Sequence, residues 1–162
     1  ALGLQLGADV PFFIFGTPAL ATGVGEILKK YSNLPELYLV LCDPGVSAST
    51  SDVFKKLDFR LTSPANYNMN TGLNALAGGQ WGDGRKRLHN DLEASACSLY
   101  PEIGSAKEEM AFLLDRKVYM SGSGSSLFAL FSGSEDAGKA YELLAEKWSR
   151  GPEKVFLTSL RR

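Results

Sequence analysis

The stretch "KVYMSGSGSSLFALFS", residues 117–132, places two short apolar runs on either side of a loop of serine and glycine. Short apolar runs bounded by turn-forming residues are typical of β-strands, and the tight loop between them indicates a hairpin-like pair. We call residues 121–126 the glycine loop. Its glycines allow backbone N–H groups to converge on an anion. It lacks Gly-Lys-Ser/Thr and precedes a strand, so it matches neither a Walker A loop nor a dinucleotide fingerprint. A plain strand connection is the more economical interpretation of the loop taken alone.

Further strands and helices are predicted on both sides of this hairpin. The continuous apolar run "LYLVLC", residues 37–42, predicts a strand covered on both faces. Ser49, with Asp52 three residues later, predicts a helix start. Residues 134–149 predict an amphipathic helix with acids in its first turn, and residues 153–160 predict the last strand.

Two more helices are predicted just before the hairpin. Asn90 is placed to cap the first, with Glu93 at its third position in the reciprocal capping arrangement. That helix should stop near Leu99, before Pro101. Residues 103–116 predict the second helix. Its apolar side chains able to face a core are Ile103, Met110, Phe112 and Leu113.

The order of these elements predicts an α+β fold. From about residue 35 the chain reads strand, helices, strand, strand, helix, strand. This order favours helices packed on one face of a mostly antiparallel four-stranded sheet. We therefore expect residues 35–162 to form one domain, and residues 66–87 to be a turn-rich surface excursion within it.

Residues 1–34 do not fit that unit and predict the end of a preceding domain. Residues 11–15 are aromatic and β-branched and predict a strand. Residues 19–31 predict a second strand, in which Gly23 and Gly25 mark a bulge or a close approach of a ligand. A helix with two tolerated glycines is the alternative. The chain begins with Ala1 rather than Met, which suggests a fragment or a processed product.

The composition is that of a globular protein with no nucleic-acid-binding character. The 162 residues are 44% hydrophobic and 22% charged, with a formal net charge of −1. That balance argues against disorder, a membrane span or extensive phosphate-backbone binding, and leaves a small anionic ligand open. Cys42 and Cys97 lack disulfide or zinc spacing. With no signal peptide pattern, we expect a reducing, cytoplasmic location.

Few side chains stand out as candidates for chemistry. Asp9 lies in "LGADVPFFIFG", residues 6–16, directly before four large apolar side chains and a proline. By position alone it is a turn residue that accepts a backbone hydrogen bond. His89 is the only histidine, and its place before Asn90 favours a solvated helix start over a general base. Asp91 and Glu93 are better explained as partners of a helix dipole than as metal ligands.

Read together, several segments resemble a known family. They are "LGADVPFF", "ATGVGEIL", "DPGVSAST", "HNDLE" and "MSGSGSSLFALF", in that order and spacing. They resemble the C-terminal half to two-thirds of the 4-diphosphocytidyl-2-C-methyl-D-erythritol kinases, within the GHMP small-molecule kinase superfamily. The resemblance covers nearly the whole chain and is weakest over residues 66–87.

The resemblance implies a reaction and a set of site residues. The reaction is transfer of the ATP γ-phosphoryl group, with Mg²⁺, to the 2-hydroxyl of diphosphocytidyl methylerythritol. The aspartate of the GADVP motif is the family's catalytic base and falls on Asp9. The residues implied to bind substrate are Gly7, Ala8, Val24, Gly25, Gly122, Ser123 and Gly124. The two predicted partners are this substrate and ATP, and a homodimer is left open.

The chain also departs from the family pattern. The family's ATP-phosphate loop and an N-terminal lysine that partners the aspartate lie upstream of Asp9 and are absent here. We therefore expect the chain alone to be inactive, because charge stabilisation supplies most of the acceleration in phosphoryl transfer. Two alternatives remain. One is another GHMP kinase, such as a homoserine or mevalonate-type kinase, and the other is a non-catalytic ligand-binding or dimerising α+β module.

Overall fold

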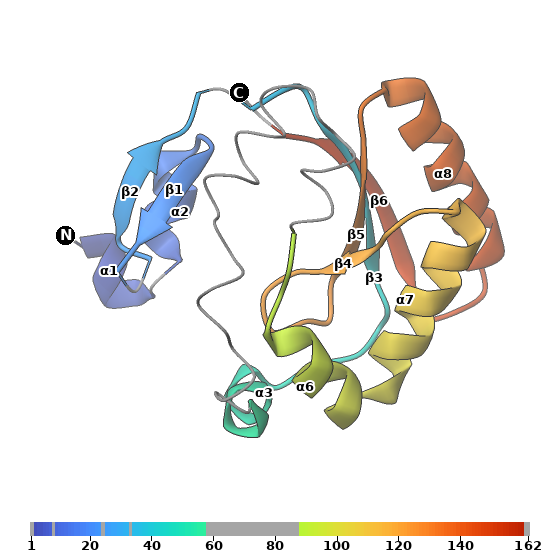
Figure 1. Ribbon diagram of the computed structural model, residues 1–162, viewed down its shortest axis with the longest axis horizontal. Helices are drawn as coiled ribbons and strands as arrows, with labels where there is room; N and C mark the ends of the chain where they lie inside the picture. Colours follow the sequence, from blue (N-terminus) through green and yellow to red (C-terminus); the bar gives the residue numbers. More distant parts are fainter. Residues whose placement is uncertain (1, 8, 24, 33, 58–87, 161–162) are drawn as a thin grey trace.

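A four-stranded antiparallel sheet forms the centre of the molecule. The computed structural model describes residues 2–7, 9–23, 25–32, 34–57 and 88–160, and the strand order is β4-β5-β3-β6 (Figure 1). Every neighbouring pair in this sheet is antiparallel. The predicted α+β class and hairpin are confirmed. The four strands are β3 Tyr38–Asp43, β4 Tyr119–Met120, β5 Leu127–Phe131 and β6 Lys154–Ser159.

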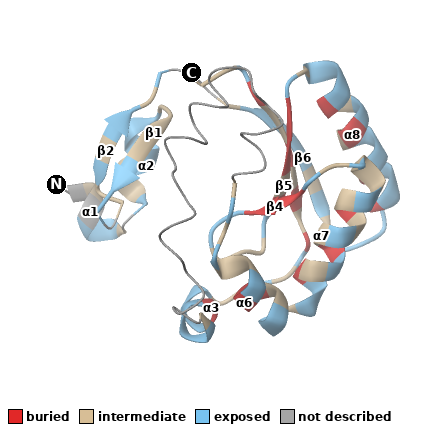
Figure 2. Ribbon diagram, viewed as in Figure 1, coloured by how far each residue is buried: buried red, intermediate tan, exposed pale blue. Residues whose placement is uncertain are grey.

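The helices α7 Pro101–Leu114 and α8 Ser134–Lys147 lie on one face of this sheet (Figure 1). On β3, Val40 is paired with Ala129 of β5 and with Leu157 of β6, so these three side chains share a face. Val40 and Ala129 are completely buried, and the buried residues gather between the sheet and the helices (Figure 2). The hydrophobic core therefore lies between one sheet face and these helices.

The prediction that residues 37–42 are covered on both faces was correct only in part. Val40 and Cys42, on the helix side, are fully buried. Leu39 and Leu41, on the other side, are only partly buried. The apolar run is continuous because both faces of the strand carry apolar side chains. The sequence does not reveal how completely other elements cover each face.

Two predicted helix boundaries are confirmed by their local hydrogen bonds. Helix α3, Thr50–Lys56, is capped by Ser49, whose hydroxyl accepts from the Asp52 amide N–H at 3.4 Å. Helix α6, Leu92–Leu99, ends before Pro101, which opens α7 directly. Its N-cap is Asp91 rather than the predicted Asn90, which lies one position earlier in the chain.

On α7, the prediction for Phe112 was wrong. Ile103 and Met110 are completely buried and Leu113 is partly buried, as expected, but the Phe112 side chain is 86% exposed. Phe112 follows Met110 by two positions, which is about 200° around a helix, so the two side chains cannot share the core face.

Residues 11–15 were predicted as a strand and belong instead to a helix, α2 Val10–Phe15. Pro11 occupies the first turn, where its missing N–H and fixed φ favour a helix. Gly16 ends the helix in the left-handed conformation, with φ of 65°, and its N–H donates to the Phe12 carbonyl at 3.1 Å. These two terminal residues outweigh the strand preference of the aromatic and β-branched side chains between them.

A hairpin follows α2. It consists of β1 Ala19–Thr22 and β2 Ile27–Lys30, so the predicted single strand is two strands joined by a turn. Gly23 and Gly25 lie in that turn, with φ of 74° and 105°. The predicted bulge was wrong because the glycines supply the positive φ that reverses the chain.

The N-terminal elements α1 Leu2–Leu6, α2, β1 and β2 lie beside the sheet unit rather than within it (Figure 1). The division into residues 1–34 and 35–162 stays a prediction, and the predicted excursion at residues 66–87 lies outside the described residues. In the described part of the chain, no helix is long and apolar enough to cross a membrane.

Candidate functional site

The glycine loop between β4 and β5 is tightly folded. The Ser121 N–H donates to the Ser126 carbonyl at 2.9 Å, and the Gly124 N–H donates to the Ser121 carbonyl at 3.0 Å. Gly122 and Gly124 have φ of 55° and 87°, values that residues with a Cβ adopt only at a cost. Glycine at these two positions therefore permits the sharp path of the loop.

Two side chains from other elements hold the glycine loop. The Asn90 amide nitrogen donates to the Met120 carbonyl at 2.9 Å and to the Gly122 carbonyl at 2.8 Å. The Thr50 hydroxyl, at the start of α3, lies 2.8 Å from the Ser123 hydroxyl. The loop is thus fastened to the starts of α6 and α3, which come from distant parts of the chain.

The start of α3 is itself fixed. The Tyr100 hydroxyl, at the junction of α6 and α7, accepts a hydrogen bond from the Ser49 N–H at 3.0 Å. The hydroxyls of Ser49 and Ser51 lie 3.1 Å apart. Thr50 lies between these two serines in the chain. These contacts therefore hold its hydroxyl in a fixed position beside the glycine loop.

The glycine loop retains hydrogen-bond donors for a ligand. Within the described residues, the N–H groups of Gly122, Ser123 and Ser125 donate to no backbone carbonyl. Successive amides in a tight turn form a concave surface that suits anionic oxygens. The arrangement can therefore hold a phosphate or another polar anion.

The two glycines should differ in their tolerance of substitution. A Cβ on Gly124 would lie 3.0 Å from Met120 Sδ and 3.4 Å from Ile103 Cδ1, whereas a Cβ on Gly122 would meet no atom within 4 Å. We expect Gly124→Ala to destabilise the protein by about 2 kcal/mol and Gly122→Ala by about 1 kcal/mol, because only the first adds crowding to the strain of positive φ. Urea unfolding of both variants measures the difference. Equal losses would contradict this prediction.

Asp9 lies at the start of α2 with its side chain exposed. Its backbone carbonyl accepts hydrogen bonds from the N–H groups of Phe12 and Phe13, at 3.1 and 3.3 Å. Its carboxylate forms no capping bond. The carboxylate is therefore accessible, and no burial cost opposes its charge.

The predicted site residues are not all gathered in one place. Among the described residues, no hydrogen bond joins Asp9 to the glycine loop. Gly7 lies next to Asp9 in the chain and accepts from the Val10 N–H at 3.3 Å. Gly122, Ser123 and Gly124 lie together in the glycine loop. Ala8 and Val24 lie outside the described residues.

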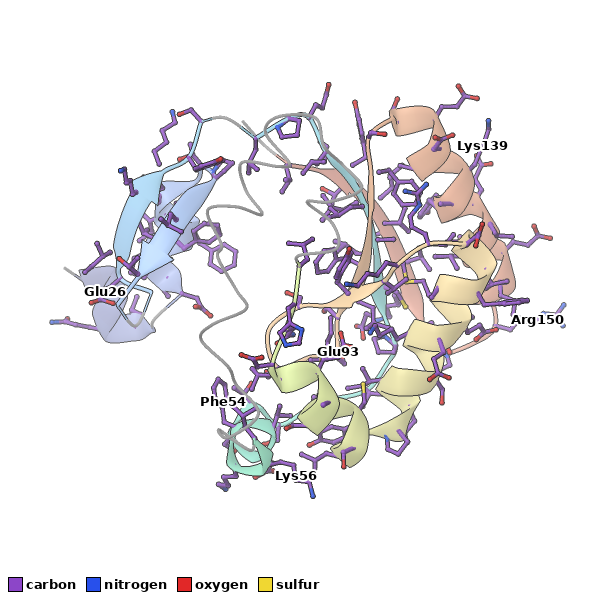
Figure 3. The ribbon with its side chains drawn as sticks, in the orientation of Figure 1. Glu26, Phe54, Lys56, Glu93, Lys139 and Arg150 are labelled. Atoms are coloured by element: carbon purple, nitrogen blue, oxygen red, sulfur yellow. The ribbon has the colours of Figure 1, made fainter. Side chains whose placement is uncertain are left out.

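Gly25 belongs to the turn between β1 and β2, together with Gly23 and Glu26. A Cβ on Gly23 would lie 2.6 Å from a carboxylate oxygen of Glu26, so this carboxylate packs closely over the turn (Figure 3). A Cβ on Gly25 would meet no atom within 4 Å. The turn is therefore tight at Gly23 and open at Gly25.

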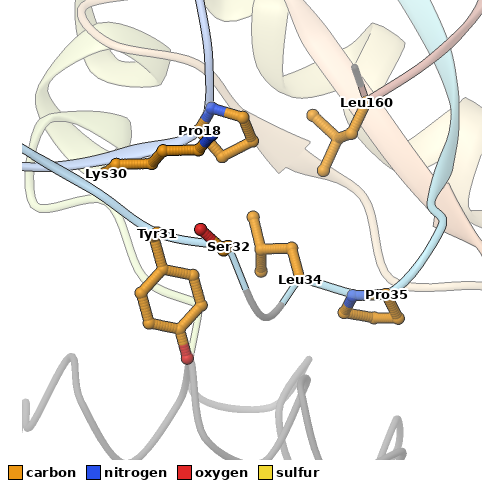
Figure 4. A pocket seen from close by; sticks show the side chains of 7 residues that line it. All are labelled: Pro18, Lys30, Tyr31, Ser32, Leu34, Pro35 and Leu160. Carbon is orange, nitrogen blue, oxygen red and sulfur yellow. The ribbon is translucent and has the colours of Figure 1, made fainter. Parts of the chain in front are cut away.

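The sequence did not predict two adjoining pockets between the N-terminal elements and the end of β6. One of about 160 Å³ has Leu160 facing Pro18 and Leu34 (Figure 4). The other, of about 390 Å³, extends along α2. Its lining residues are Phe12, Phe13, Gly16, Thr17, Pro18, Ala19, Tyr31, Leu34 and Leu160. These residues are scattered along the chain, so no local sequence signal marks the pockets.

Charged residues near the start of α6 pair with one another. His89 Nε2 lies 2.8 Å from Asp91 Oδ1, and His89 is exposed, as predicted for a solvated helix start. Glu93 forms an ion pair with Lys107 of α7, so the reciprocal capping bond predicted for Glu93 is replaced by this pair. Among the described residues, no group of three His, Cys, Asp or Glu side chains is placed to hold a metal ion.

The cysteines are unsuited to nucleophilic catalysis. Both are free thiols. Burial, with smaller effects from Glu153 and Asp43, raises the pKa of the Cys42 thiol to about 12. Burial also raises the pKa of Cys97. Thiols with raised pKa values stay protonated near neutral pH, and the protonated form is the unreactive one.

Comparison with known proteins identifies similar sequences. Residues 72–150 match the family described as GHMP kinases C terminal. A 4-diphosphocytidyl-2-C-methyl-D-erythritol kinase from Syntrophotalea carbinolica is 41% identical over 145 residues, covering 90% of this chain and 50% of that protein. The chain spans about half the length of the curated relatives it matches.

Solved structures agree with these sequence matches. A crystal structure of 4-(cytidine 5'-diphospho)-2C-methyl-D-erythritol kinase is 34% identical with a TM-score of 0.76, covering 98% of this chain and 56% of that one. A homoserine kinase from Cytophaga hutchinsonii shares the fold at 18% identity and a TM-score of 0.65, covering 97% of this chain and 56% of that one.

Proposed function

We propose that the protein containing this chain phosphorylates the 2-hydroxyl of 4-diphosphocytidyl-2-C-methyl-D-erythritol with ATP, because residues 72–150 match the family described as GHMP kinases C terminal and the fold is similar to that of a solved kinase of this name. This reaction is a step of non-mevalonate isoprenoid synthesis. The observation that carries the proposal is the 41% identity to a kinase of that name over 90% of the chain. The agreement in fold with a second kinase of that name adds support.

In this proposal Asp9 accepts the proton of the substrate hydroxyl as its oxygen attacks the γ-phosphorus. An exposed carboxylate that forms no side-chain capping bond at α2 has a lone pair available for that proton. The substrate contacts included in this proposal are Gly7 and Ala8, which precede the base in the chain, and Val24 and Gly25, assigned to the cytidine side.

The glycine loop supplies the second part of the site. In the proposal, the substrate phosphates bind to the amides of Gly122, Ser123 and Ser125. Among the described residues these amides donate to no backbone carbonyl. Such preorganised donors stabilise the charge on the transferring group without reorganising during the reaction.

Mg²⁺ belongs to the proposal as the partner of ATP. The described residues offer no cluster of three acidic, histidine or cysteine ligands. They do not fit an ion caged by protein alone, whereas Mg²⁺ in kinases is held largely by phosphate oxygens and water. We therefore derive no step of the reaction through the ion.

We also propose that the protein acts in the cytoplasm, where ATP is found and where both free thiols stay reduced. The similar proteins that carry this kinase name come from bacteria such as Syntrophotalea carbinolica. A homodimer stays a prediction that sedimentation at several protein concentrations can check.

A substrate comparison on the full-length protein tests the proposed activity. We expect ATP-dependent phosphorylation of diphosphocytidyl methylerythritol, with kcat/KM at least about a hundredfold above the values for homoserine and mevalonate, because those acceptors lack the cytidine diphosphate group. Phosphorus NMR identifies the phosphorylated hydroxyl. Preference for homoserine or mevalonate would favour the other GHMP kinases, and binding of cytidine diphosphate without turnover would favour a ligand-binding module.

A further inference from the structure

The Asn90 side chain uses both of its donor hydrogens and its oxygen to join separate elements. Its amide nitrogen donates to the carbonyls of Met120 and Gly122, at 2.9 and 2.8 Å. Its amide oxygen accepts from the Leu92 N–H at 3.1 Å. One partly buried side chain therefore joins the start of α6 to the end of β4 and to the glycine loop.

The two donated bonds are directed at the part of the loop where the backbone turns. Met120 is the last residue of β4, and Gly122 is the first loop residue in the left-handed region. Fixing both carbonyls sets the Met120–Ser121 and Gly122–Ser123 peptide planes. The N–H of Ser123 belongs to the same peptide unit as the Gly122 carbonyl, so the bond to Asn90 also sets the direction of that free N–H.

We infer that Asn90 is a positioning residue that orients the free amides of the glycine loop toward the bound phosphates. This role rests on the proposed function. Sequence reasoning identified Asn90 only as a helix cap, which accounts for its oxygen and not for its nitrogen.

The chemistry at this position is specific to an amide. Aspartate would keep the oxygen that accepts from the Leu92 N–H at the start of α6, since aspartate and asparagine accept backbone N–H groups at helix starts equally well. It would lose the donor, and a carboxylate would then face two carbonyl oxygens. Serine keeps a capping oxygen but is too short to reach both carbonyls. Each substitution therefore removes donated hydrogen bonds to the loop while it keeps an oxygen that can accept from an N–H at the start of α6.

The neighbouring Asp91 offers a matched control. It is exposed, makes no side-chain capping bond, and pairs with His89. Asp91→Asn is the reverse exchange of Asn90→Asp, one residue away in the same helix start. It leaves the contacts of the glycine loop untouched.

The test measures amide hydrogen exchange and steady-state kinetics on the full-length protein with Asn90→Asp, Asn90→Ser and Asp91→Asn. In both Asn90 variants we expect exchange at the hydrogen-bonded amides of Ser121 and Gly124 to accelerate by about tenfold or more, while α6 keeps its protection. We expect kcat to fall by about tenfold to a hundredfold with a smaller change in KM, because a displaced loop no longer holds the phosphates in line. Asp91→Asn should match the unsubstituted protein.

Unchanged exchange at Ser121 and Gly124 would overturn the inference, and so would faster exchange with unchanged kcat. Loss of protection throughout α6 would show that Asn90 acts only as a cap and would overturn it too. If Asn90→Asp fails to fold, Asn90→Ser decides. An unsubstituted protein without kinase activity would refute the proposed function, and the exchange data would still decide whether Asn90 positions the loop.

Discussion

The Asp9→Asn variant of the full-length protein is expected to lose turnover by about a hundredfold to ten-thousandfold, the contribution of a positioned general base. Asparagine keeps the shape of aspartate and removes its basicity, so the substrate hydroxyl loses its proton acceptor. Asp9 is exposed and its carboxylate forms no capping bond, so the substitution should leave the stability of α2 nearly unchanged.

Steady-state kinetics and calorimetric titration with diphosphocytidyl methylerythritol check this result together. We expect kcat to fall while the dissociation constant of the substrate changes little, because the interaction removed acts only in the transition state. Asp136→Asn is the control, since Asp136 is an exposed aspartate in the first turn of α8. An Asp9→Asn enzyme with undiminished kcat would remove Asp9 from the mechanism.

The fold of residues 88–160 was largely predictable because local and global signals agree there. The Pro101 boundary, the acidic first turn of α8 and the apolar runs of the hairpin all predict the elements that form. Residues 10–15 show where this reasoning fails. Their side chains favour a strand, whereas Pro11 and Gly16 at the ends make a helix. End residues determine a six-residue element more strongly than its interior does.

The candidate site was proposed from the sequence only in its parts. Taken alone, the glycine loop is a strand connection and Asp9 is a turn residue, and the resemblance to the kinase family is what made both of them site candidates. The contacts that hold the loop join residues far apart in the chain, such as Asn90 with Gly122 and Thr50 with Ser123. No local sequence pattern predicts hydrogen bonds between residues so far apart in the chain. Only the structure therefore revealed how the loop is held in place.

Truncation of Ile103 to alanine is expected to destabilise the chain by about 2 to 5 kcal/mol, the usual range when a buried isoleucine is cut to alanine. Ile103 is completely buried and belongs to the core cluster between sheet and helices. Its Cδ1 also lies 3.4 Å from the place of a Cβ on Gly124, so it forms part of the floor beneath the glycine loop. The cavity left by its removal would therefore open against the core and the loop together.

Phe112→Ala on the same helix is the matched comparison. The Phe112 side chain is 86% exposed, so its removal should change the free energy of unfolding by no more than about 0.5 kcal/mol. Urea unfolding followed by circular dichroism gives both values, and the slope with denaturant should stay the same because neither change alters the surface exposed on unfolding. A loss at Phe112 as large as that at Ile103 would mean that another part of the protein covers this face of α7. A small loss at Ile103 would mean that the core collapses into the cavity, contrary to what the close packing of protein interiors leads us to expect.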